Sequence, residues 1–458
     1  MDAVTAQPVD HVATLPVGDA EPPDEERRAA VRDILGAYFS SRMLVWIVGM
    51  ATALAVGFYP GTTILLDPHH LTAPFHEHLI NVLVSPAARW DSAWYLSIAK
   101  TGYVLPYQSV FFPIYPALVA IGGAGVGRGL DILVGIFISV VCSIGALYLL
   151  HRLVTLDFNP RLARNTVWIV AWLPTAMVLS AVYSEALFLL LAIGCFYTAR
   201  HSRWALTGLL GGLAAASRNG GILLLVPLLV FYLYGPREDR EPDFAAGGVT
   251  ALPEPGTLSL VDRLRLWAQT NLPPRYRLRR DVAWFALVPL GLLAYMIYLG
   301  FTTGYPLGPF THQAHWGRYF LPLGAIPLGI WSVLKAAYGS IPGLDPNLAH
   351  HMSVSGATHH VYALAFLLLS LSLLWICWKR LPAAYTAYAA ISLIMAVSVP
   401  AHNEPLKSFP RFTLVMFPLW IALALWATEH RRVRTVIAVS APFLALTTYL
   451  FVTWAWTP

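Results

Sequence analysis

Long apolar runs, separated by short and often basic segments, constrain this 458-residue chain more than any other feature of its sequence. Hydrophobic residues make up 57% of the chain and charged residues only 12%, whereas a soluble protein is about a quarter charged. The chain is therefore expected to be an all-α, polytopic membrane protein with about eleven transmembrane helices. The predicted spans cover residues 43–66, 130–150, 165–182, 184–199, 204–217, 221–234, 281–301, 361–378, 382–399, 411–428 and 435–454.

The distribution of Lys and Arg predicts the orientation of these spans, because cytoplasmic loops collect basic residues. Most basic clusters fall on one side if the N-terminus is cytoplasmic and residues 112–128 do not cross the membrane. That short run contains two prolines and several glycines, so we expect it to be re-entrant or interfacial. Residues 1–42 then form a disordered and amphipathic cytoplasmic N-terminus, and residues 43–458 form the transmembrane domain. Within it, 67–129 is an outer loop with short interfacial helices and 235–280 is a cytoplasmic loop.

The net charge of +6 needs no nucleic-acid partner, because the basic residues lie largely in the predicted cytoplasmic loops. The chain has three cysteines, Cys142, Cys195 and Cys377, and all of them lie within apolar runs. We expect them to be buried thiols that form no disulfide.

One stretch of the outer loop combines several aromatic residues with a single carboxylate, and it is predicted to form a short helix. Ser85 is a suitable N-cap, and Pro86 stands where a first-turn proline is favoured. Gly102 is a suitable C-terminal stop. The helix is therefore expected to begin just after Ser85 and to end before Gly102.

Two interpretations of this helix remain open from its pattern. Trp90 and Trp94 share one face, while Asp91 and Tyr95 share the neighbouring face. The first interpretation is an interfacial helix at the water–lipid boundary, in which Asp91 only stabilises the N-terminal half. In the second interpretation, Asp91 is a catalytic base held at the membrane surface.

The same topology places further polar residues on the outer side of the membrane, where ionisable groups between helices usually mark a site. Each has a simpler interpretation as a helix cap or an ion-pair partner, and Glu185 with Arg218 is the expected pair. Their position in one compartment with Asp91 favours a site. The candidates are Glu185, Arg218, Asn219, Gln313, His315, Trp316, Arg318 and Arg411.

Histidines gather in the outer segments, with pairs at 69–70, 350–351 and 359–360 and a His-Glu-His run at 76–78. Their spacing matches no defined metal-binding motif. A solvated, histidine-rich outer loop is the preferred interpretation, and a metal ligand set is the alternative.

Several blocks of residues follow one another in a characteristic order. The first outer segment contains Arg89-Trp90-Asp91 with Trp94-Tyr95, and then Phe111 through Pro116. The later blocks are Pro174 through Ser180, Tyr183 through Phe188, Ser217 through Gly220, Gln313 with Trp316, and Pro410 through Phe412. Together they resemble the PIG-V family, the mannosyltransferases that add the second mannose of the GPI anchor, and its bacterial relatives. The resemblance covers most of the chain from about residue 43 onward.

The resemblance implies a GT-C glycosyltransferase with its active site on the extracytoplasmic side. Residues 43–458 would be the catalytic domain, 67–129 its catalytic loop, and Asp91 would match the family's first-loop carboxylate. The implied donor is dolichyl phosphate mannose or a bacterial polyprenyl counterpart. The chain lacks the long lumenal insertions of eukaryotic members, and its composition is typical of a high-GC bacterium. A bacterial enzyme of the plasma membrane is therefore favoured over one of the endoplasmic reticulum.

Such a reaction is a single inverting displacement, in which Asp91 takes the proton of the acceptor hydroxyl. Arg218 and Arg411 are the candidates to bind the leaving phosphate, because guanidinium binds phosphate with a planar fork. No cofactor is expected, and a divalent metal is not required because the donor carries a single phosphate. Residues expected to contact substrate are Arg89, Trp90, Trp94, Tyr95, Glu185, Arg218, Asn219, Gln313, His315, Trp316 and Arg411.

Other classes of function remain as alternatives. A flippase or transporter of lipid-linked sugars would carry polar residues at mid-membrane, and a non-enzymatic assembly subunit would tolerate the loss of Asp91. A GT-C enzyme that uses another polyprenyl-phosphate sugar is the third alternative. The expected partners of the enzyme are the lipid-linked donor, a glycolipid or glycan acceptor and the lipid bilayer.

Overall fold

The computed structural model describes residues 24–126, 130–239, 275–339 and 354–455. Within these residues the chain is helical, and an isolated antiparallel bridge between Arg318 and Ala401 is the one feature of β type. The predicted all-α fold is therefore confirmed. The predicted disordered segment up to residue 23 and the histidine pair at 350–351 lie outside the described residues.

Five helical stretches in the described part of the chain are long and apolar enough to cross a membrane. They are α1 (Asp24–Val56), α5 (Asp131–Asp157), η6 with α11 (Arg280–Ala286 and Leu287–Thr302), α15 (Val354–Arg380) and α19 (Val433–Val452). Helix α1 runs without a break through the predicted boundary between residues 42 and 43. The amphipathic part of the N-terminus and the first span thus form one helix. This helix ends at Val56, whereas the first span was predicted to end at residue 66.

Shorter helices fill the remaining predicted spans. They are α6 (Pro160–Ala171), α7 (Glu185–Arg200), α8 (Trp204–Ser217), η5 with α9 (Asn219–Leu224 and Leu225–Tyr234), α16 (Ala383–Val397), α17 (Phe409–Leu414) and α18 (Phe417–Glu429). A further short helix, α13 (Ala325–Gly339), lies between the predicted spans 281–301 and 361–378, in a segment predicted to be on the outer side. The predicted total of about eleven spans stays a prediction.

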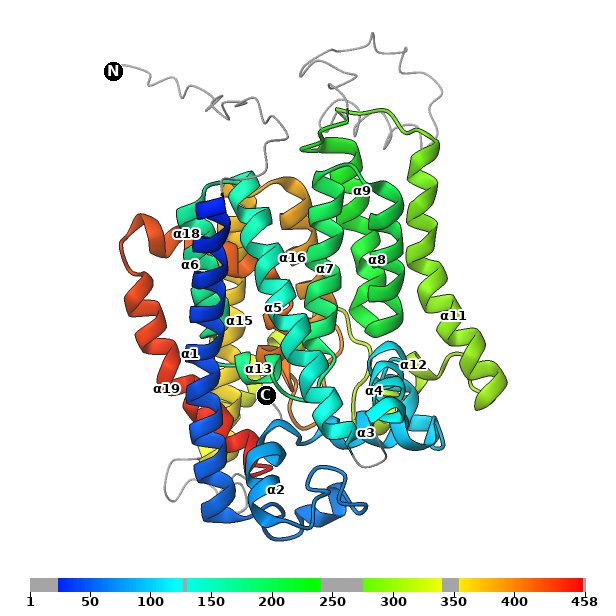
Figure 1. Ribbon diagram of the computed structural model, residues 1–458, viewed down its shortest axis with the longest axis vertical. Coiled ribbons are helices and arrows are strands. Elements are labelled where there is room, and N and C mark those ends of the chain that lie inside the picture. Colours follow the sequence, from blue (N-terminus) through cyan, green and yellow to red (C-terminus); the bar gives the residue numbers. More distant parts are fainter. Residues whose placement is uncertain (1–23, 127–129, 240–274, 340–353, 456–458) are drawn as a thin grey trace.

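The predicted outer segments fold into short helices. They are η1 (Thr63–Leu66), α2 (His78–Val84), η2 (Ser85–Ala87), α3 (Asp91–Thr101), η3 (Pro106–Val110), α4 (Ile114–Val126), α12 (Gly308–Thr311) and η7 (His312–Trp316). Helices α2, α3, α4 and α12 lie together at the lower end of the bundle in Figure 1. Helix α4 has 13 residues and is about 20 Å long, less than the roughly 30 Å of a bilayer core, which agrees with its interpretation as a non-spanning segment.

Helix α7 occupies the core of the bundle, and its sequence is apolar on all sides for that reason. The ring of Phe196 contacts Phe231 of α9, Tyr385 of α16 and Phe417 of α18, with ring centroids 5.1–6.0 Å apart. Edge-to-face contacts of this kind fix how neighbouring helices pack. The first turn of α7 is therefore held firmly in the bundle, which matters because Glu185 begins it.

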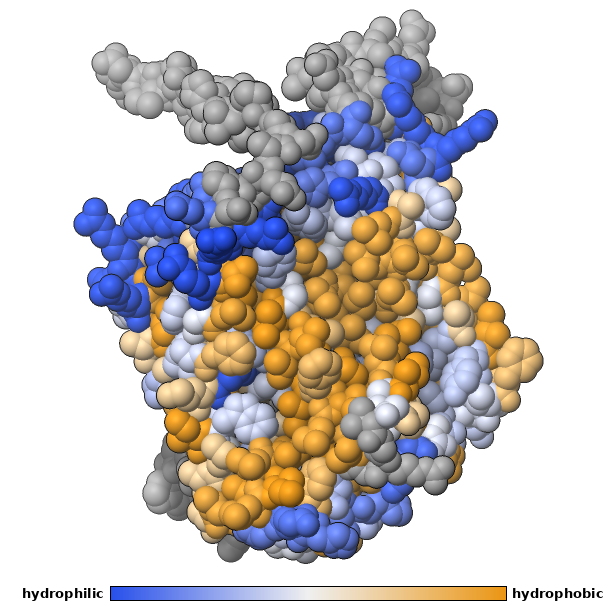
Figure 2. All heavy atoms as spheres, viewed as in Figure 1, coloured by the Kyte–Doolittle hydropathy of each residue, from blue (hydrophilic) through white to orange (hydrophobic). Residues whose placement is uncertain are grey.

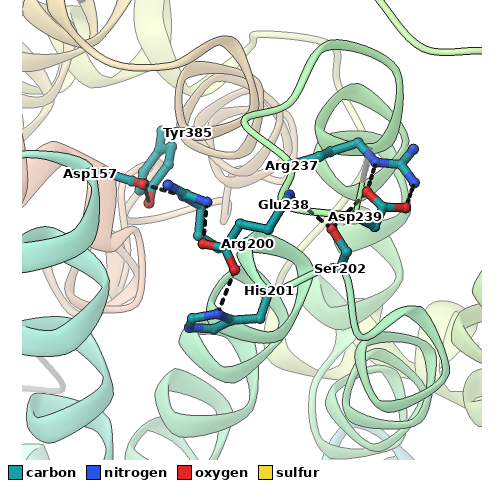
Figure 3. A network of polar contacts seen from close by, with 8 residues as sticks. All are labelled: Asp157, Arg200, His201, Ser202, Arg237, Glu238, Asp239 and Tyr385. Atoms are coloured by element: carbon teal, nitrogen blue, oxygen red, sulfur yellow. Dashed lines mark hydrogen bonds and ion pairs between the residues drawn. The ribbon is translucent and has the colours of Figure 1, made fainter. Parts of the chain in front are cut away.

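The upper end of the bundle carries many of the hydrophilic residues on the face shown in Figure 2. Arg200, at the end of α7, lies 2.9 Å from Asp157 and 2.7 Å from Glu238, and Tyr385 donates to Asp157 (Figure 3). Glu185 and Arg200 stand at opposite ends of α7, about 22 Å apart. The polar network of Figure 3 is therefore at the opposite end of the bundle from Glu185.

The helix predicted to begin after Ser85 begins instead at Asp91. Residues Ser85–Ala87 form the separate 3-10 turn η2, and Trp90 then adopts a φ of 55°, in the left-handed region that bulky residues rarely occupy. The predicted start is wrong because nothing in the local sequence signals a positive φ at a tryptophan. Gly102, with a φ of 73°, follows the last residue of α3 as predicted.

Close backbone contact joins α8 to α11, and it yields a prediction about stability. A Cβ atom on Gly291 would lie 2.0 Å from the carbonyl oxygen of Gly212. We therefore expect Gly291→Ala to force the helices apart, to cost about 1–3 kcal/mol and to lower the midpoint of thermal unfolding in detergent. Gly125→Ala is the matched control, because no atom lies within 4 Å of its Cβ position. Equal midpoints for the two variants would show that α8 and α11 tolerate separation.

Candidate active site

A cavity of about 620 Å³ lies at the end of the bundle that carries the short outer helices. Its walls come from the first outer segment, the start of α7, the turn between α8 and η5, η7, and the start of α17. The structure brings ten of the twelve predicted site residues to this cavity. They are Trp90, Asp91, Trp94, Tyr95, Glu185, Arg218, Asn219, Gln313, Trp316 and Arg411.

Helix α3 presents Asp91 to the cavity from its first turn. The backbone N–H of Asp91 donates to the Tyr183 hydroxyl at 3.3 Å, and this hydroxyl donates to the Arg89 carbonyl at 3.1 Å. These bonds hold the strained Trp90 between them, and backbone strain of about 1–3 kcal/mol is typical of functional sites. Tyr95 lines the cavity and is also buried in the hydrophobic core, so α3 is packed against the bundle. The catalytic role of Asp91 stays a prediction.

Four charged side chains form a continuous chain of ion pairs on the cavity wall. Asp91 Oδ2 lies 2.7 Å from Arg411 Nη1, and Arg411 Nε lies 3.2 Å from Glu185 Oε1. Glu185 Oε1 also lies 2.7 Å from Arg218 Nη1, which confirms the predicted pair. The Glu185 side chain is only 1% exposed, whereas that of Asp91 is 24% exposed. Glu185 is therefore an internal counter-charge, and Asp91 is the carboxylate that a ligand in the cavity reaches.

A third guanidinium, that of Arg318, lies beside this series of ion pairs and has no ion pair with a described carboxylate. Its Nη2 donates to the Lys407 carbonyl at 2.9 Å and its Nη1 to the Val399 carbonyl at 3.3 Å. Burial, and then the neighbouring Arg411 cation, lower the pKa of Arg318 to about 10, so the group is charged at neutral pH. A half-buried cation that makes no ion pair with a described carboxylate is suited to an anionic ligand.

The ring of Phe412 lies close to all three guanidinium groups. The Cζ atoms of Arg218, Arg318 and Arg411 lie 5.4, 5.2 and 5.5 Å from its centroid. The aromatic face stabilises the cations. The ion pairs of these three arginines with described carboxylates involve only Asp91 and Glu185, so the guanidiniums outnumber their ion-pair partners.

Short segments of irregular backbone place two of these arginines. The backbone N–H of Tyr319 donates to the Pro400 carbonyl at 3.1 Å, and that of His402 donates to the Gly317 carbonyl at 3.0 Å. This pairing fixes Arg318 against the segment that leads to α17. Ser408, with a φ of 60°, then turns the chain into the short helix that carries Arg411.

Aromatic rings make up another wall of the cavity. The ring of Trp94 meets those of Tyr107 and Trp316 edge to face, with centroids 5.5 Å apart in each case. Phe111 lies 5.6 Å from Trp316 and 6.1 Å from Trp94. Rigid aromatic faces of this kind suit the apolar faces of a sugar.

Two predicted site residues do not line the cavity, and both predictions are corrected. Arg89 is fully buried, where it donates to the carbonyls of Ser85 at 2.7 Å and Val452 at 3.0 Å. It is a structural link between the first outer segment and α19. His315 is exposed and stacks on Tyr107 with centroids 4.0 Å apart, so it contacts the aromatic wall only from outside.

Arg318, one of the polar residues that the predicted topology places on the outer side, also lines the cavity. Lys407 and Tyr107 line it as well, although no sequence pattern singled them out. Among the described residues, no group of three or more His, Cys, Asp or Glu side chains is arranged to hold a metal ion. The three cysteines are buried and free, as predicted.

A second cavity, of about 550 Å³, adjoins the first. It is lined mainly by apolar side chains of α16 and of the segments around α12 and α17, among them Tyr388, Met395 and Val415. The residues that the two cavities share are Arg218, Asn219, Gln313, Arg318 and Phe412. Arg218 and Arg318 therefore stand on a wall that the polar and the apolar cavity share, and this shared wall is called the cationic wall below.

These features define an integral membrane protein with a charged cavity at one end of an all-helical bundle. The sequence profile of the family described as Mannosyltransferase (PIG-V) matches residues 31–233, a segment that includes Asp91, Glu185 and Arg218. The resemblance to this family predicted from the sequence is confirmed for this segment, and the predicted blocks after residue 233 stay a prediction. The expected bacterial origin stays a prediction.

Curated relatives also match part of the chain. GPI alpha-1,6-mannosyltransferase 2 of Mus musculus is 31% identical over 163 residues, which are 33% of this chain and 33% of the relative. GPI mannosyltransferase 2 of Cryptococcus neoformans is 31% identical over 160 residues, 33% of this chain and 38% of the relative. The chain thus spans about a third of the length of these relatives in the matched part. Among solved structures, the Archaeoglobus fulgidus oligosaccharyltransferase tethered with an acceptor peptide aligns with a TM-score of 0.39 and 15% identity, over 92% of this chain and 56% of that one.

Proposed function

We propose that this chain is a GT-C mannosyltransferase that moves mannose from a polyprenyl phosphate donor to a lipid-linked or glycan acceptor, with inversion. The observation that carries the proposal is the cationic wall between a polar and an apolar cavity, with Asp91 on the polar side. The similarity to the PIG-V family supports mannose as the sugar.

The two cavities match the two halves of such a donor. Its prenyl chain would lie in the apolar cavity, and its phosphate would lie at the shared wall against Arg218 and Arg318. The sugar would then extend into the polar cavity toward Asp91 and the aromatic wall. Arg411 is already paired with both Asp91 and Glu185, so we assign the phosphate to Arg218 and Arg318 and give Arg411 the role of positioning Asp91.

In the proposed reaction, the acceptor hydroxyl attacks the anomeric carbon while the bond from that carbon to the phosphate oxygen breaks. Arg411 holds Oδ2 of Asp91, and the described residues make no hydrogen bond to Oδ1. Oδ1 is therefore the oxygen that takes the hydroxyl proton. Polyprenyl phosphate leaves with its charge stabilised by the guanidiniums. The one-ended position of the polar cluster favours this function over a transporter, whose polar residues would lie at mid-membrane.

The proposed side of the membrane is extracytoplasmic, in a plasma membrane or, for a eukaryotic source, that of the endoplasmic reticulum. We expect an impermeant thiol reagent to label a Val104→Cys variant on intact cells and to label Arg203→Cys only after lysis. Val104 is 66% exposed at the end that carries the cavity, and Arg203 is exposed on the turn between α7 and α8. Labelling of Arg203→Cys but not Val104→Cys on intact cells would reverse the topology.

The phosphate assignment yields a kinetic prediction. Arg218→Lys keeps the positive charge but loses the planar fork, so we expect the donor KM to rise about tenfold, which corresponds to one charge-assisted hydrogen bond. Arg200→Lys is the matched control, because Arg200 also pairs with carboxylates but lies at the opposite end of α7. An unchanged donor KM in both Arg218→Lys and Arg318→Lys would remove the phosphate from this wall.

A further inference from the structure

A third cavity, of about 580 Å³, lies between α18 and α19, with α15 and the end of α6 behind it. None of its lining residues lines the two cavities of the candidate active site. It is therefore a separate feature of the molecule, at a place where the proposed transfer reaction needs no binding site.

The lining residues follow two helical stripes that face each other. Trp420 and Trp426 belong to the stripe on α18, and Val439 and Phe443 belong to the stripe on α19. Away from the α18–α19 turn both stripes are apolar apart from Ser440, and beside the turn they are polar. From Arg432 at this turn to Phe443, the cavity wall extends about 16 Å, close to half of the roughly 30 Å bilayer core. The wall thus has the length of one leaflet.

Positive charge gathers at the turn end of the cavity. Arg432 lines the cavity and has no ion pair with a described carboxylate, and Arg431 and Arg434 lie beside it. The nearby Glu429 is engaged by Arg380 at 2.9 Å. His430 donates from Nδ1 to the Trp426 carbonyl at 2.8 Å, so its Nε2 remains for a ligand. This turn lies at the upper end of the bundle, where Figure 2 shows hydrophilic residues on the visible face.

The apolar part of the cavity faces outward from the bundle. The side chains of Trp426, Val439 and Phe443 are 40%, 56% and 43% exposed and stand on its rim. An occupant therefore enters sideways from the surrounding bilayer. It needs an apolar chain about one leaflet long and an anionic headgroup at the basic end.

We propose that this cavity binds one anionic phospholipid, with its phosphate on Arg432 and His430 and an acyl chain between α18 and α19. By the positive-inside rule this end is cytoplasmic, so the lipid belongs to the inner leaflet and to the face opposite the candidate active site. The bound lipid would fill the space between α19 and the rest of the bundle. The proposal stands whether or not the transfer reaction does.

Native mass spectrometry of the protein purified in mild detergent tests the proposal. Phosphatidylglycerol and phosphatidylcholine with the same acyl chains are added separately, and bound lipid and the thermal midpoint are measured. We expect one phosphatidylglycerol to persist per chain and to raise the midpoint, whereas phosphatidylcholine does neither. Arg432→Gln should lower the affinity for phosphatidylglycerol about tenfold, and Val439→Trp should block the chain by filling the cavity.

Arg203→Gln is the matched control, because it removes an exposed arginine from the same end of the bundle but outside the cavity. It should bind phosphatidylglycerol like the unaltered protein. Equal retention of both lipids, an equal loss in Arg203→Gln, or a second protein chain in place of the lipid would overturn the proposal. The side chain of Arg432 is exposed, so Arg432→Gln should keep the fold and the test stands even if Val439→Trp misfolds.

Discussion

The Asp91→Asn variant is expected to fold normally and to lose on the order of two to four powers of ten in turnover. Asparagine keeps the size of aspartate and still accepts a hydrogen bond from Arg411, but it takes no proton at working pH. Donor binding should hardly change, because the base acts on the acceptor hydroxyl. Turnover and donor KM, measured with detergent-purified protein, check both parts of the expectation.

Asp91→Glu provides a second variant with the charge retained. The extra methylene shifts the carboxylate by about 1 Å, enough to spoil the geometry of attack, so we expect little activity. If Asp91 only stabilised the N-terminal end of α3, its charge would contribute about 0.3–1 kcal/mol to stability. Turnover of the Asp91→Asn variant would then be almost unchanged. A folded Asp91→Asn protein with near-normal transfer would therefore remove the catalytic assignment.

The Glu185→Gln variant is expected to lose about 3–5 kcal/mol of stability, the largest loss among the site variants. Its carboxylate is buried between Arg218 at 2.7 Å and Arg411 at 3.2 Å, and a neutral amide leaves these cations undercompensated. Turnover should fall as well, because Arg411 would no longer be held in place to orient Asp91. Thermal unfolding in detergent, with and without added lipid, measures the first effect.

Glu238→Gln is the matched control for this change. Glu238 also pairs with two basic side chains, Arg200 at 2.7 Å and His201 at 2.9 Å, but its own side chain is 32% exposed. Water screens such pairs, so their loss should cost less than about 1 kcal/mol. Equal destabilisation by the two variants would show that burial of Glu185 does not set its importance.

The helices and their order were largely predictable from the sequence, because apolar runs long enough to span a bilayer leave few alternatives. The exact boundaries of individual helices were harder to predict. The start of α3 at Asp91 depends on a positive φ at Trp90, and the surrounding fold imposes that conformation. The end of α1 at Val56, by contrast, was signalled, because Gly57 with a φ of 81° follows directly and Pro60 comes soon after.

The membership of the candidate site and the Glu185–Arg218 ion pair were predictable, but the other contacts within the site were not. The topology and the resemblance brought Asp91, Glu185, Arg218 and Arg411 to one side of the membrane. Only the folded chain shows that Arg411 joins the two carboxylates and that Arg318 is the cation without an ion-pair partner among the described residues. Pairings of this kind depend on tertiary packing over hundreds of residues of sequence separation, on which local patterns carry no information.

The roles of Arg89 and His315 were wrong for the same reason. Each lies in a segment whose neighbours do line the cavity, so proximity in sequence favoured both as site residues. In the folded chain, Arg89 is buried and donates to the carbonyls of Ser85 and Val452. His315 is exposed, stacks on Tyr107 and does not line the cavity.

Transfer of radiolabelled mannose tests the proposed function most directly. Purified protein is incubated with radiolabelled polyprenyl phosphate mannose and a membrane extract that supplies glycolipid and glycan acceptors. The proposed function predicts that the unaltered protein passes label to an acceptor, that label transfer requires the protein, and that the Asp91→Asn protein passes almost none. Donor that binds to the unaltered protein without any transfer of label, or equal transfer by the Asp91→Asn protein, would contradict it.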